Sequence, residues 1–121
     1  MRNSDMQNQR EQDDAAEIEG RAEEIEQELR EELLDGGYYD LWHRDGGIKK
    51  RQVYDSADVI SAMIDLDSDT FDAAIMLSGK DPLQGAKALT ELMARAVDHL
   101  VAEAPTLATA KFEIENKEKA A

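Results

Sequence analysis

The first part of the chain carries a narrow apolar stripe with helical spacing. Between residues 11 and 35, apolar positions recur three and four residues apart, while Glu and Arg fill most other positions. The stripe consists of Ala15, Ile18, Ala22, Ile25 and Leu29. A stripe so short is marginal as an isolated helix, so it must pack on the rest of the chain or on another copy. We expect Ile18, Ile25 and Leu29 to form the seam of a homodimer.

Residues 36–54 hold two Gly-Gly pairs, the only Trp and all three Tyr. One interpretation is a β-hairpin with its turn at Asp45-Gly46, which would place Trp42 opposite Lys49. The other is a short helix over residues 38–44 followed by a loop. We favour the hairpin and leave both interpretations open.

Helix start and stop signals recur along residues 55–104. Asp55 or Ser56 can cap one helix, and Ser68 or Asp69 can cap a second. Asp81-Pro82 then predicts the start of the longest apolar stripe, which Pro105 ends. The first two of these helices carry the apolar residues Val59, Ile60, Met63, Ile64, Phe71, Ala74, Ile75 and Leu77. The tail from residue 105 fits either a strand or a helix.

These patterns predict a mainly α fold, a small single domain of four to five helices with the optional hairpin at residues 38–54. We expect residues 1–10 to be a disordered N-terminal tail, followed by a single helical domain. The domain divides into an acidic first helix (11–35), an aromatic and basic connector (36–54), a helical core (55–104) and a C-terminal segment (105–121), so that it spans 11–121.

Charge narrows the choice of partners. The chain has 28 acidic and 14 basic residues, a formal net charge of −14. Residues 1–35 hold 13 of the acids, and residues 55–79 hold six acids and no base. Such a charge repels nucleic acid and anionic membranes and favours basic proteins. No signal peptide or membrane-spanning run is recognisable, so we expect a cytoplasmic protein.

No pattern assigns catalysis. There is no cysteine, and no phosphate-binding or nucleophile motif, so we expect neither an enzyme nor a cofactor. Asp65, Asp67 and Asp69 alternate as calcium ligands do, but Thr70 and Met76 stand where a calcium loop needs Gly and Glu. We therefore interpret this stretch as a helix junction with acidic caps and expect no metal site.

The acidity itself is the candidate for function. Carboxylates repeated every three or four residues on a helix form a charged row with about 5–6 Å between neighbours. The candidate partner-binding residues are Glu17, Glu24, Glu28, Glu31, Asp58, Asp65, Tyr39 and Trp42. The basic cluster at residues 49–51 we expect to be neutralised by the acidic helix or by a second subunit.

In size and acidity the chain resembles the small helical DNA-mimic inhibitors that phages and plasmids use. The resemblance implies capture of a basic, nucleic-acid-binding protein and no direct contact with nucleic acid. The alternative function is a homo-oligomeric structural or assembly adaptor, or a chaperone, which would use the first helix as its dimerisation seam.

Overall fold

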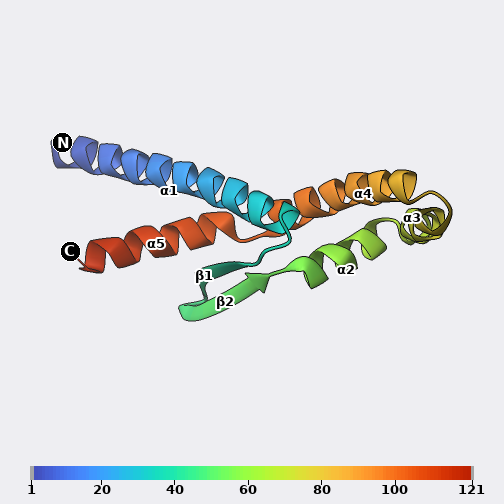
Figure 1. Cartoon of the computed structure of the whole chain (residues 1–121). Helices are drawn as coiled ribbons and strands as arrows, with labels where there is room; N and C mark the ends of the chain where they lie inside the picture. Colours follow the sequence, from blue (N-terminus) through green and yellow to red (C-terminus); the bar gives the residue numbers. More distant parts are fainter. Residues whose placement is uncertain (1, 121) are drawn as a thin grey trace. The chain divides into compact units, whose positions relative to one another are not determined.

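The computed structural model describes the backbone of residues 2–120 and the side chains of residues 14–117. Within these residues the chain forms five helices and one two-stranded hairpin (Figure 1). The elements are α1 (Arg2–Leu34), β1 (Tyr39–Asp45), β2 (Ile48–Tyr54), α2 (Ser56–Leu66), α3 (Ser68–Lys80), α4 (Pro82–Glu103) and α5 (Thr106–Ala120). The mainly α fold is confirmed, the connector is a hairpin, and the C-terminal segment is a helix.

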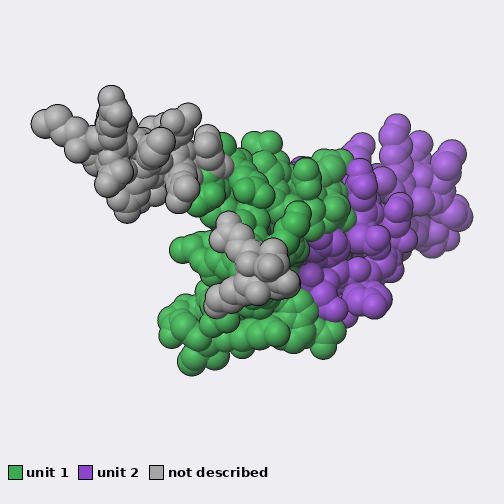
Figure 2. All heavy atoms as spheres, turned by 90° about the vertical axis from the view of Figure 1, so that its left-hand side faces the viewer, with its two compact units in different colours: residues 1–28, 41–52, 105–121 green, residues 29–40, 53–104 purple. Residues whose placement is uncertain are grey.

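The chain divides into two compact units, shown in different colours in Figure 2. Unit 1 comprises residues 1–28, 41–52 and 105–121, and unit 2 comprises residues 29–40 and 53–104. Both units therefore take residues from α1 and from the hairpin. The backbone of residues 2–10, where we expected a disordered tail, belongs to α1, and the side chains of residues 1–13 lie outside the described part.

In unit 1, helix α5 lies beside α1. The Arg21 Nε donates to Glu113 at 2.6 Å, and the Thr106 hydroxyl donates to Glu26 at 3.2 Å. The buried residues of this unit are Ala22, Ile25, Leu41, Thr106, Thr109, Ala110 and Phe112. Positions 106, 109 and 110 follow helical spacing, which explains why α5 is a helix despite its alternating composition.

The hairpin turns at Gly46 and Gly47, which have φ values of 60° and 81°. Two residues with positive φ form the type I′ turn that suits a two-residue hairpin loop. The predicted turn at Asp45-Gly46 was therefore wrong by one residue. Asp45 is the last residue of β1, and the changed register places Trp42 opposite Arg51.

In unit 2, helices α2, α3 and α4 pack on one another. Their buried residues are Val59, Ala62, Met63, Ala74, Gly85, Leu92, Ala96, Val97 and Val101. The contact between α3 and α4 is close at Gly85, where an added Cβ would overlap the backbone of Ser78. Only glycine fits this approach.

Acidic caps start the helices of unit 2. Asp55 accepts the amides of Ala57 and Asp58, and the Asp58 carboxylate accepts the amide of Asp55 at 3.0 Å, a capping box. Asp81 caps α4 by accepting the Gln84 amide at 3.2 Å, as predicted. Helix α3 is capped by Asp67, not by Ser68 or Asp69 as we expected.

Candidate functional site

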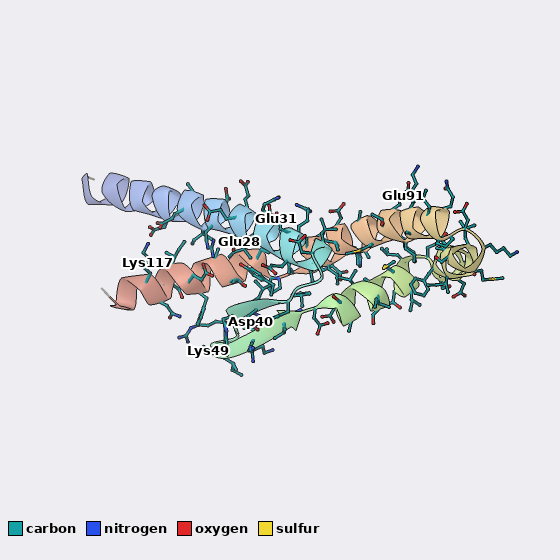
Figure 3. All side chains as sticks on the ribbon, in the orientation of Figure 1. Glu28, Glu31, Asp40, Lys49, Glu91 and Lys117 are labelled. Atoms are coloured by element: carbon teal, nitrogen blue, oxygen red, sulfur yellow. The ribbon has the colours of Figure 1, made fainter. Side chains whose placement is uncertain are left out.

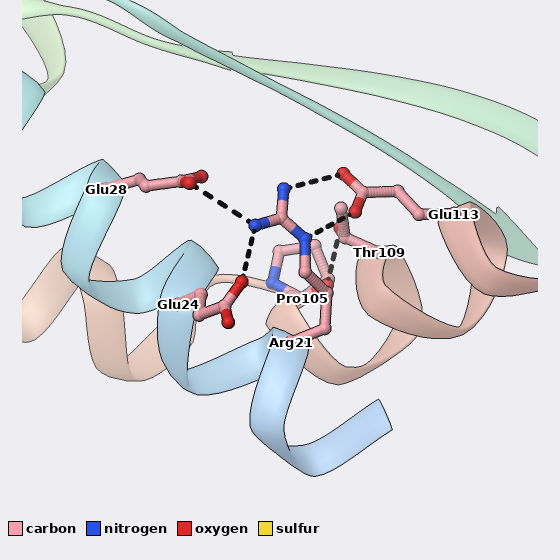
Figure 4. A network of polar contacts seen from close by, with 6 residues as sticks. All are labelled: Arg21, Glu24, Glu28, Pro105, Thr109 and Glu113. Atoms are coloured by element: carbon pink, nitrogen blue, oxygen red, sulfur yellow. Dashed lines mark hydrogen bonds and ion pairs between the residues drawn. The ribbon is translucent and has the colours of Figure 1, made fainter. Parts of the chain in front are cut away.

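The acidic row on α1 is partly neutralised by a cation of its own helix. Arg21 binds three carboxylates (Figure 4): both oxygens of Glu113 at 2.6 and 3.4 Å, Glu24 at 3.1 Å and Glu28 at 3.3 Å. These bonds, the strongest to Glu113, raise the pKa of the guanidinium above its ordinary value, although burial lowers it. Two predicted partner-binding residues, Glu24 and Glu28, are therefore engaged within the chain.

The two remaining residues of the predicted row lie at opposite ends of it. Glu17 is exposed and lines a groove of about 340 Å³ in unit 1, together with Gly20, Ile114 and Lys117. Glu31, labelled in Figure 3, is also exposed, but it belongs to unit 2. The four glutamates thus do not act as one free row, because Arg21 holds the middle pair.

The predicted dimer seam is mostly buried within the single chain. Ile25 and Leu29 are both 0% exposed, and Ile18 is half-buried. Buried side chains offer no apolar surface to a second copy. Ile25 and Leu29 therefore have another explanation, namely packing within the chain, and the homodimer stays a prediction without their support.

The cations of the hairpin are also engaged within unit 1. Lys50 binds Asp45 at 3.0 Å, which lowers the pKa of that carboxyl group. Lys49 lies 4.8 Å from the ring centre of Trp42, and Arg51 lies 5.6 Å from it. Trp42, a predicted partner-binding residue, is 40% exposed and carries two cations. Lys50 is thus paired within its own hairpin, and the expected neutralisation of the whole cluster by the acidic helix or by a second subunit stays a prediction.

The aspartates of residues 55–72 fall into two groups. Asp58 and Asp67 cap helices, and hydrogen bonds from the hydroxyl and amide of Thr70 lower the pKa of Asp67. Asp65, Asp69 and Asp72 are exposed and form no ion pair with any side chain that the structure describes. Of the two aspartates that we predicted to bind a partner, Asp58 has a structural role and Asp65 is available.

Helix α2 presents a second apolar stripe to solvent. Val59 and Met63 are buried as expected, but Ile60 is 50% exposed and Ile64 is 41% exposed. We expected residues 55–104 to form a helical core, and the exposure of Ile60 and Ile64 departs from this because, among the described elements of unit 2, only α3 and α4 pack against α2.

A groove of about 480 Å³ continues this stripe towards the start of α2. It is lined by Gly36, Gly37, Tyr38, Val53, Asp55, Ser56 and Ala57. Tyr38 is 66% exposed, whereas the predicted partner-binding residue Tyr39 is half-buried and already has an interaction within the chain. Sequence reasoning chose the less accessible of the two tyrosines.

Other types of site receive no direct support. Among the described residues, no three His, Asp or Glu side chains lie close enough to hold a metal ion. His99 pairs with Glu103 at 3.3 Å on the exposed side of α4. In the described part of the chain no helix is both long and apolar enough to cross a membrane. No model of a protein family, no curated protein and no solved structure matches this chain.

Proposed function

We propose that this protein is a non-catalytic acidic module that captures a basic protein, and that its charge acts through unit 2. One observation carries the proposal. Asp65, Asp69 and Asp72 are exposed and unpaired among the described side chains, in a stretch of residues 55–79 that contains no Lys or Arg. The glutamates of α1 next to Arg21 are paired, so they contribute less to the outward field.

Unpaired surface carboxylates act mainly on the rate of association. They attract a basic surface over a distance of about a Debye length, roughly 8–10 Å at physiological salt. A charge of −14 on a chain of 121 residues keeps the protein away from nucleic acid and brings it towards proteins that bind nucleic acid. The finer form of the proposal is therefore a cytoplasmic inhibitor that occupies the basic surface of a nucleic-acid-binding protein.

The adaptor alternative gains no observation of its own. It relied on α1 as a dimerisation seam, and the side chains of Ile25 and Leu29 are buried within one chain. Sedimentation equilibrium of the intact chain tests it separately, since an adaptor of this kind requires an oligomer whose stability changes little with salt.

The test compares two sets of variants in which carboxylates are replaced by neutral amides. The partner is first captured from the native host with the tagged chain and identified by mass spectrometry. Its association rate is then measured by surface plasmon resonance across a salt series. We expect the triple variant Asp65→Asn/Asp69→Asn/Asp72→Asn to associate more slowly, with a flatter salt dependence than the parent.

The control variant is Glu24→Gln/Glu28→Gln, which removes two carboxylates that are bound to Arg21 within the chain. We expect it to associate at close to the parental rate. If the captured protein is not basic, or if the triple variant keeps the parental rate and salt dependence, the proposed function is wrong.

A further inference from the structure

The groove and the exposed stripe of α2 form one apolar surface in unit 2. We name it the α2 groove and define it by Tyr38, Val53, Ala57, Ile60 and Ile64. Tyr38, Val53 and Ala57 line the same hollow, and positions 57, 60 and 64 lie on one face of α2 because they are three and four residues apart. Four of its members are large apolar side chains that are 41% to 66% exposed.

The residues of the α2 groove are separate from those that α2 buries in the core of unit 2. Helix α2 buries Val59, Ala62 and Met63, which lie on its other flank. Nothing in the described part of unit 2 covers Ile60 or Ile64, since both remain exposed. A contiguous apolar surface that a protein leaves in water is typical of a binding site.

The charge around the α2 groove favours one class of occupant. Asp55 lines the hollow, and Asp58 and Asp65 lie on the same helix. The sequence has no Lys or Arg from residue 52 to residue 79. A second copy would bring like charges together across the contact, which opposes association. A partner with Lys or Arg beside its apolar residues would instead meet opposite charge.

The shape of the α2 groove favours a helical partner. The stripe from Ala57 to Ile64 covers eight residues, a rise of about 10 Å along a helix axis. That length matches two turns of a helix with apolar residues at positions i, i+3 or i+4, and i+7, the pattern of helices that bind in grooves. Tyr38 adds an exposed aromatic ring at one end, a residue type that often dominates binding energy.

We infer that the α2 groove binds an amphipathic helix of another protein, with an apolar stripe of about two turns flanked by Lys or Arg. The inference rests on the proposed function and names the element of the basic partner that is bound. The apolar stripe supplies affinity by leaving water, and the basic flanks orient the helix over the aspartates.

The probe is a synthetic amphipathic helix of Leu and Lys, with the Leu residues on one face. A second peptide has the same composition with the Leu residues scattered around the helix, and a third has Glu in place of Lys. Fluorescence anisotropy at physiological salt measures their binding to the intact chain. We expect the first peptide to bind at least about tenfold more tightly than either of the others.

Matched variants locate the contact. Ile60→Ser/Ile64→Ser removes apolar surface from the α2 groove without changing charge, and Met76→Ser/Leu83→Ser does the same at positions of unit 2 that are 71% and 78% exposed. We expect the first pair to weaken binding at least about tenfold and the second pair less than about twofold. Circular dichroism checks that both variants keep their helices.

Each failure has a distinct meaning. If both serine pairs weaken binding equally, or neither does, the α2 groove is not the site. If the scattered peptide binds as well as the striped one while the aspartate variants still slow association, the helix inference is wrong and the proposed function survives. If the Glu peptide binds as well as the Lys peptide, both are wrong. If the chain forms a dimer that Ile60→Ser/Ile64→Ser dissociates, the occupant of the α2 groove is a second copy of the chain and not a basic helix.

Discussion

The two units differ in where their best-paired charges and their exposed apolar side chains lie. In unit 1, Arg21 binds three carboxylates, and the hairpin cations lie over aromatic rings or pair with Asp45. In unit 2, the aspartates of residues 55–79 that do not cap helices are unpaired among the described side chains. Unit 2 also holds ten of the 13 large apolar side chains that are exposed. The density of acids along the sequence therefore does not show which carboxylates are paired, since Arg21 engages three of them in unit 1.

The largest expected effect tests whether unit 2 has a core of its own beneath its exposed surface. Leu92 on α4 is 2% exposed, and its replacement by Ala removes buried volume. We expect Leu92→Ala to lower the free energy of unfolding by about 2–5 kcal/mol in urea denaturation. The control Leu83→Ala changes a side chain that is 78% exposed and should cost less than about 0.5 kcal/mol. Equal losses of stability in the two variants would contradict the burial of Leu92 in the core of unit 2.

The next effect concerns the pairing of charges in unit 1. Arg21→Gln leaves Glu24, Glu28 and Glu113 without their shared cation. Because the network is at the surface, we expect a loss of about 1 kcal/mol in the free energy of unfolding at low salt, and a smaller loss at high salt.

Arg30 provides the matched control for this network, since it pairs with the single carboxylate of Asp98 at 3.1 Å in unit 2. Arg30→Gln should cost less than Arg21→Gln in the same urea denaturation. Equal costs would mean that the three-carboxylate network is no stronger than one surface pair.

Replacing two glycines by Ala is expected to change the free energy of unfolding in opposite directions. An added Cβ at Gly20 in α1 would meet nothing within 4 Å, whereas at Gly85 it would meet the backbone of Ser78. We expect Gly20→Ala to raise the free energy of unfolding by about 0.5–1 kcal/mol, because Ala restricts the unfolded chain and favours helix. Gly85→Ala should lower it. Thermal denaturation of both variants checks the signs. If Gly20→Ala is destabilised, the added methyl group meets atoms that this structure does not place near Gly20.

The smallest effect is a pH dependence at Asp67. Hydrogen bonds from Thr70 lower the pKa of its carboxyl group in the folded state. The unfolded state therefore binds the proton more tightly, so this contribution to stability is present above about pH 4 and is lost as the pH falls below it. We expect Asp67→Asn to flatten the acid limb of a stability–pH curve more than Asp69→Asn does. Equal slopes would contradict the assignment.

Local sequence signals predicted several helix boundaries, but not the start of α1 at Arg2 or the Asp67 cap of α3. The caps at Asp55 and Asp81, the stop at Gly36 and the break at Pro105 act through neighbouring backbone groups, so the sequence contains all of the information they need. The turn was harder, because Asp45-Gly46 and Gly46-Gly47 both suit a type I′ turn and differ only in register.

The candidate site was harder to predict, because it depends on tertiary pairing. Arg21 and Glu113 are 92 residues apart, and no periodicity of α1 could show that α5 brings a third carboxylate to this cation. Ile60 and Ile64 looked like core residues by spacing alone. Their exposure follows from how few helices surround α2 in its unit. The sequence shows that the chain is acidic, but not which carboxylates are already paired within it.

The central claim is that unit 2 carries the recognition surface. Hydrogen–deuterium exchange of the intact chain, measured with and without its captured basic partner, tests this most directly. The account predicts new protection of backbone amides in α2, at Ser56–Leu66, and in the adjoining Gly36–Tyr38 segment. The parts of α1 and α5 that belong to unit 1 should exchange as before. Protection confined to those parts of α1 and α5, with α2 unchanged, would contradict it.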